Sequence, residues 1–91
     1  MNEIYKYSNP NIVKQLGNKY LNKEIYLSSR KDKKYMIQDP NGKWIHFGAM
    51  GYKDFTLTGD ENQRRLFRQR NHKWAYAKKY SPAWLSYYLL W

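Results

Sequence analysis

The sequence predicts a small α+β domain in which a three-stranded antiparallel sheet packs with two or three short helices. Two runs of alternating apolar and polar residues flank the tetrapeptide Asp39-Pro40-Asn41-Gly42, whose residue types fit a tight turn at each position. A lone hairpin is marginally stable in water, and the preceding run at residues 24–28 is typical of a third strand. Segments with helical spacing precede and follow the strands in the sequence.

Alternation along the strand that follows the turn places Trp44 and His46 on one face of the sheet, and Ile45 and Phe47 on the other. The three predicted strands span residues 24–28, 33–38 and 43–47.

A first helix is expected over residues 10–16. Ser8 and Asn9 are suitable capping residues, Pro10 fits the first helical position, and Gly17 follows the last apolar residue of the helical face. The chain of 91 residues forms a single domain, near the size at which a core alone gives little stability.

A second helix is expected over residues 59–72, after a glycine-rich loop. Thr58 and Glu61 have the spacing of a capping box, in which each side chain accepts a hydrogen bond from the other residue's backbone N–H. At 100 degrees per residue, three arginines and a histidine share one arc of this helix, opposite Leu66, Phe67 and Trp74.

The basic residues concentrate in this part of the chain. The formal net charge is +10, and no Asp or Glu follows Glu61. This concentration of positive charge favours an anionic partner, although a solvated helix face is the simpler interpretation. The residues expected to contact nucleic acid are Arg64, Arg65, Arg68, His72, Lys73, Lys78 and Lys79.

Arg70 is the exception among the arginines, because helical spacing places it among the apolar residues. A buried guanidinium needs a carboxylate or an aromatic plane. Asp54 in the preceding loop is the expected partner, in a structural pair that ties the loop to the helix.

The C-terminal segment is rich in large apolar residues. Ser81 and Pro82 can open a helix over residues 82–90. Its apolar groups are too many for one buried stripe, so the segment either packs across the sheet or forms an interface with a partner. The candidate interface residues are Trp84, Leu85, Tyr88, Leu89 and Trp91.

The runs "IHFGAMGYKDFT", "ENQRRLFRQRN" and "SPAWLSYYLLW" resemble a small family without an assigned activity, found in large DNA viruses of eukaryotes and in tailed, crAss-like phages. The resemblance covers residues 33–91 and implies a viral origin. Where members from giant viruses often have a His and an Asp after the Thr, this chain has Leu57 to Asp60. The matching residues are His46, Phe47, Gly48, Tyr52, Asp54, Phe55, Thr56, Arg64, Arg65, Phe67, Arg70, Leu90 and Trp91.

Catalysis would require His46 as acid or base, with Asp54 or Glu61 as an orienting or metal-binding carboxylate. The chain has no cysteine, two histidines, no P-loop and no nucleophile–base pair with an orienting group. We therefore expect no enzyme activity, no catalytic residue, no metal and no cofactor.

Two non-enzymatic functions remain open and are compatible. The basic residues would bind nucleic acid, expected to be DNA, without sequence preference and with a steep salt dependence. Alternatively, the protein is a minor virion or head component that contacts viral capsid proteins through its C-terminus. With no apolar stretch long enough to span a membrane, a soluble protein of the host cytoplasm or the virion is expected.

Overall fold

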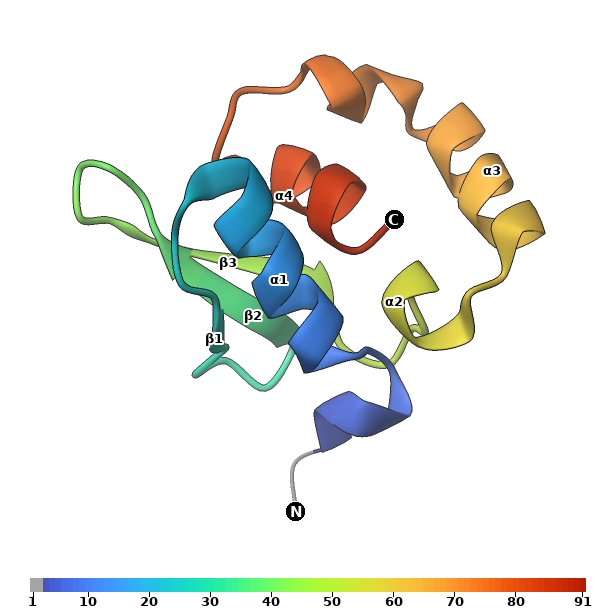
Figure 1. Cartoon of the computed structure of the whole chain (residues 1–91), viewed down its shortest axis with the longest axis horizontal. Helices are drawn as coiled ribbons and strands as arrows, with labels where there is room; N and C mark the ends of the chain where they lie inside the picture. The colour runs from blue at the N-terminus through green and yellow to red at the C-terminus, as the bar shows by residue number, and fades with distance from the viewer. Residues whose placement is uncertain (1–2) are drawn as a thin grey trace.

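The computed structural model describes residues 3–91, and it consists of one sheet whose inner face is covered by helices (Figure 1). The strand order is β1-β2-β3, and each neighbouring pair is antiparallel, which confirms the predicted fold class. In chain order the elements are η1 (Glu3–Lys6), α1 (Pro10–Leu21), β1 (Tyr26–Leu27), β2 (Lys33–Gln38), β3 (Trp44–Ala49), α2 (Phe55–Thr58), α3 (Glu61–Arg70), η2 (His72–Tyr76) and α4 (Pro82–Leu89).

The β2–β3 hairpin closes through the side chain of Asp39. Its Oδ1 accepts hydrogen bonds from the backbone N–H groups of Asn41 and Lys43, both at 2.9 Å. β2 has the predicted bounds, whereas β3 begins one residue later and ends two residues later than predicted. β1 is shorter than the predicted strand, because Ile25 leaves the ladder and packs against α1.

α1 continues past Gly17, where the sequence predicts its end. Asn9 caps the helix by accepting from the N–H of Asn11, and the helix ends at Asn22, which has a left-handed backbone. Gly17 is buried, and a Cβ there would overlap Ile25 Cγ1 and lie 2.8 Å from Ile25 Cδ1. This glycine therefore allows the close approach of α1 and the segment just before β1.

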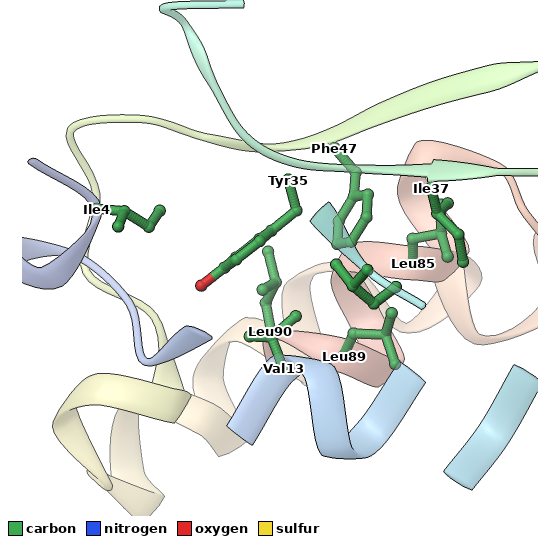
Figure 2. Packing of buried hydrophobic residues seen from close by; sticks show 9 residues of the cluster. Ile4, Val13, Tyr35, Ile37, Phe47, Leu85, Leu89 and Leu90 are labelled. Carbon is green, nitrogen blue, oxygen red and sulfur yellow. The ribbon is translucent and has the colours of Figure 1, made fainter. Parts of the chain in front are cut away.

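The core lies between the sheet and the helices α1 and α4 (Figure 2). Tyr35 and Phe47 lie on neighbouring strands with ring centroids 5.8 Å apart. Phe47 points toward α4, whereas Tyr35 points toward the N-terminal segment. The buried apolar side chains within residues 3–91 are Ile4, Val13, Ile25, Tyr35, Ile37, Phe47, Leu85, Leu89 and Leu90.

The C-terminal helix belongs mainly to this core. Ser81 caps α4 by accepting from the N–H of Trp84 at 3.2 Å. Leu85 and Leu89 are fully buried, so the prediction of an interface is wrong for these two residues. The other three candidates, Trp84, Tyr88 and Trp91, are half-buried.

A buried ion pair joins β2 to the loop that follows β3. Lys34 Nζ lies 3.1 Å from Asp54 Oδ2, and the two side chains are 3% and 0% exposed. Lys34 also donates to the carbonyl of Tyr52 at 2.5 Å. Burial lowers the pKa of the Lys34 ammonium, and the attraction of Asp54 only partly opposes this shift. The predicted pair between Asp54 and Arg70 is wrong, because Lys34 neutralises Asp54 and Arg70 is exposed on α3.

Asp54 is also the start of α2 and part of a buried hydrogen-bond network. Its Oδ1 accepts from the backbone N–H of Thr56 at 3.0 Å and from the Thr56 hydroxyl. That hydroxyl lies 3.1 Å from Ser8 Oγ, which accepts from the Tyr35 hydroxyl at 2.7 Å. Burial raises the pKa of Tyr35. The network joins the N-terminal segment, β2 and α2.

Replacement Asp54→Ala should destabilise the protein by about 3–5 kcal/mol, because it leaves a buried lysine cation without its carboxylate. Urea unfolding provides the measurement. The matched variants are Lys34→Met and the Lys34→Met/Asp54→Ala double variant. The double variant should lose at least about 1 kcal/mol less than the sum of the single effects; additive losses would contradict a direct pairing.

Replacement Gly17→Ala should lower the free energy of unfolding by about 1–3 kcal/mol, because overlap with Ile25 outweighs the gain in helix propensity. Asn18→Ala is the control at the next, exposed position of α1, and it should be neutral or slightly stabilising. If Gly17→Ala stabilises the protein as much as Asn18→Ala, the close contact is not present in solution.

Candidate nucleic-acid interface

The basic helix α3 begins at Glu61, and Asp60 is its N-cap residue. The Asp60 side chain accepts from the backbone N–H groups of Asn62 and Gln63 at 3.0 and 3.2 Å. The predicted capping box is therefore wrong, since the Thr58 hydroxyl accepts only from the N–H of Asp60 and belongs to the preceding turn. Both residues are capping types, and α2 occupies the position where the sequence suggested a loop.

α3 lies at the periphery of the molecule, and none of its residues is fully buried (Figure 1). Its main attachment is aromatic: the ring of Phe67 stacks on that of Trp91 with centroids 4.4 Å apart and an interplanar angle of 8°. Trp74 contacts the same Phe67 ring edge-on at 5.7 Å. The side of the helix that carries Phe67 thus packs against the C-terminal residue. Periodicity predicts an apolar side opposite the arginines, but Leu66 on that side is 47% exposed.

Arg64, Arg65, Arg68 and His72 line one open hollow of about 560 Å³, together with Glu61 and Gln69. We call these four basic residues the arginine face. Helical spacing predicts their common orientation, and the structure brings all four together. Arg65 and His72 are exposed, whereas Arg64 and Arg68 are half-buried.

Two of these arginines rest on aromatic rings from neighbouring elements. The guanidinium carbon of Arg64 lies 4.5 Å from the ring centroid of Phe55 in α2, and that of Arg68 lies 5.2 Å from the centroid of Tyr87 in α4. A stacked guanidinium loses part of its rotamer freedom while its terminal N–H groups stay available at the edge. No spacing in the sequence indicates Phe55 and Tyr87 as part of the site, because only the tertiary fold places them against α3.

The arginine face contains one weak internal ion pair. Arg64 Nη1 lies 3.6 Å from Glu61 Oε1, and the Glu61 side chain is 75% exposed. An exposed pair at this distance contributes at most about 1 kcal/mol, so a phosphate can displace the carboxylate. Both Nε atoms of Arg64 and Arg68 are buried and without a hydrogen-bond partner, which leaves the outer N–H groups as the usable donors.

The remaining predicted contacts lie outside the hollow. Lys73, Lys78 and Lys79 are exposed in and after η2 and extend the positive charge along the chain. Arg70, on the other side of α3, lines a separate cavity.

The three residues considered for catalysis lie on different elements: His46 on β3, Asp54 at the N-cap of α2, and Glu61 on α3. His46 is half-buried on β3, and its Nδ1 lies 2.7 Å from Ser28 Oγ. Asp54 is committed to the ion pair with Lys34, and Glu61 is exposed on α3. Within residues 3–91, no three histidine or acidic side chains gather where they could hold a metal ion.

The family described as "Family of unknown function (DUF5754)" matches residues 23–71, which is more than half of the chain. The protein therefore belongs to this family. The matched segment runs from the first strand of the sheet to the end of α3 and includes Lys34, Asp54 and the three arginines of the arginine face. Neither a curated protein nor a solved structure matches the chain. Of the helices in the described part of the chain, none has the length and apolarity needed to cross a bilayer.

Replacement Asp60→Ala should increase the exchange of the α3 amide protons by about fivefold, because losing the cap costs the helix about 1 kcal/mol. Thr58→Ala is the matched control and should change exchange in α3 by less than about twofold, since its hydroxyl is not the helix cap. Hydrogen exchange followed by NMR provides the measurement. Equal effects of the two replacements would restore Thr58 as a capping residue.

Proposed function

We propose that this protein is a non-enzymatic nucleic-acid-binding protein that holds phosphates, without sequence preference, through the arginine face. The main support is that Arg64, Arg65 and Arg68 line one open hollow on α3, a helix that has no fully buried residue. Arginine forks match the geometry of phosphate oxygens, and each neutralised phosphate releases counterions.

The aromatic supports of Arg64 and Arg68 strengthen this interpretation. A long side chain that is already held against a ring loses less entropy when it binds a ligand. The rings of Phe55 and Tyr87 hold Arg64 and Arg68 in place, so these two arginines are better ordered for a ligand than fully solvated side chains are.

The setting that we propose is viral, either the host cytoplasm or the virion. Support comes from the resemblance of the His46-Phe47-Gly48 run and the arginine helix to proteins of large DNA viruses and tailed phages.

A role as a minor virion component is the second candidate, and the outer face of the sheet is the feature that favours it. Tyr26 and Trp44 are 42% and 43% exposed, and their rings meet edge-on at 5.7 Å. Such an aromatic pair suits a protein interface. A Tyr26→Ser/Trp44→Ser variant that still binds nucleic acid but is absent from purified particles would support this role.

The Arg64→Ala/Arg65→Ala/Arg68→Ala variant should lose binding to a mixed-sequence DNA duplex at about 50 mM salt, because it removes three phosphate contacts. For the natural sequence, affinity should fall by about a hundredfold between 50 and 200 mM salt if about four phosphates are neutralised. Fluorescence anisotropy of a labelled duplex measures both effects.

The control is an Lys14→Ala/Arg30→Ala/Lys43→Ala variant, which removes the same charge from exposed positions away from α3. It should retain most of the affinity. Equal losses in the two triple variants would show attraction by net charge alone and would contradict a specific arginine face.

A further inference from the structure

A second cavity, of about 460 Å³, lies on the opposite side of α3 from the arginine face. Its volume falls within the usual range of small-ligand sites. Aromatic side chains supply much of the wall. Phe67 and Trp91 form a stacked pair inside it, while Trp74 and Tyr52 are 36% and 72% exposed. Trp74 comes from η2 and Tyr52 from the loop after β3, so separate elements supply these two rings.

The charge around this cavity is positive. Arg70 and Lys34 are its charged lining side chains, and no Asp or Glu side chain lines it. Lys34 is already neutralised by Asp54, whereas Arg70 forms no ion pair within residues 3–91. Arg70 is therefore a cation beside an aromatic cavity, which suits a flat ligand that carries an anionic group.

Two uncharged polar side chains complete the lining. Gln63 offers an amide with both donors and an acceptor, and Ser86 offers a hydroxyl that can act as either. A few polar groups among apolar walls fix the orientation of a ligand with a hydrogen-bonding edge. The aromatic rings can stack on the face of a nucleobase, Gln63 and Ser86 can hydrogen-bond to its edge, and Arg70 can bind the phosphate of the same nucleotide.

We propose that this cavity takes one unpaired nucleobase of a single strand, stacked on Trp74, with the neighbouring phosphate on Arg70. This proposal rests on the proposed function and specifies its ligand. The arginine face holds the backbone of either a duplex or a single strand, but only an unstacked base can enter the cavity. The protein then prefers single strands at equal salt.

The test compares the binding of a labelled mixed-sequence 12-nucleotide strand and of the same sequence as a duplex. Trp74→Leu removes the stacking ring but keeps an apolar side chain, and it should weaken single-strand binding by about 5- to 150-fold, the range for one stacked base. Arg70→Gln should weaken single-strand binding and lower the slope of log affinity against log salt by about 0.7. Duplex binding should change by less than about twofold in both variants, which also verifies that α3 keeps its structure.

Lys14→Gln, at an exposed position of α1, is the control for loss of one charge and should leave single-strand binding unchanged. In competition with the single strand, deoxyadenosine monophosphate at millimolar concentration should displace it more effectively than deoxyribose 5-phosphate, which lacks the base. Unchanged single-strand binding in Trp74→Leu, or equal competition by the base-free phosphate, would overturn the proposal. If the mononucleotide binds as tightly as the whole strand, the cavity is a site for a free nucleotide and not for a base of a single strand.

The two proposals fail in different ways. If only the cavity proposal is wrong, the natural protein still binds duplex DNA, and this binding depends on Arg64, Arg65 and Arg68. If the proposed function is wrong, the natural protein does not bind duplex DNA.

Discussion

The buried ion pair between Lys34 and Asp54 is the constraint on which the placement of the basic helix depends. An unpaired lysine cation in this position would cost several kcal/mol, so the loop after β3 must return to β2 and deliver a carboxylate there. The same loop is fixed by backbone hydrogen bonds from Asp54 to Tyr7 and from Phe55 to Leu90. Since α2 and then α3 follow directly, this anchoring sets where the arginine face begins.

α3 is held differently from the rest of the chain. α1, α4 and the sheet share the core, whereas α3 is attached through Phe67 on Trp91 and through the arginines that rest on Phe55 and Tyr87. The core therefore contains no residue of the arginine face, whereas Arg64 and Arg68 help to hold α3 against α2 and α4. A peripheral helix with open space on both sides can present two different surfaces, one of charge and one of aromatic rings.

Local chemistry in the sequence was enough to predict the hairpin, the start of α1 and α4 and the common orientation of the four basic residues. Features that depend on distant segments were not predictable. Alternation along β2 places Lys34 on the face opposite Tyr35, where a lysine is usually exposed to solvent. The alternation does not show that the loop after β3 covers Lys34. Gly17 reads as a helix end, although the reason for glycine is contact with Ile25. The stacking partners of the arginines come from α2 and α4, and no sequence spacing relates them to α3.

The most direct test of the account is an NMR titration of the ¹⁵N-labelled protein with a short DNA duplex, in which backbone amide shifts report where the ligand binds. Binding through the arginine face should give saturable shifts concentrated in residues 61–72, with smaller effects in α2 and near residue 87, and none in the turn at residues 39–43. Shifts centred on the outer face of the sheet, or an unchanged spectrum at low salt, would contradict binding through the arginine face.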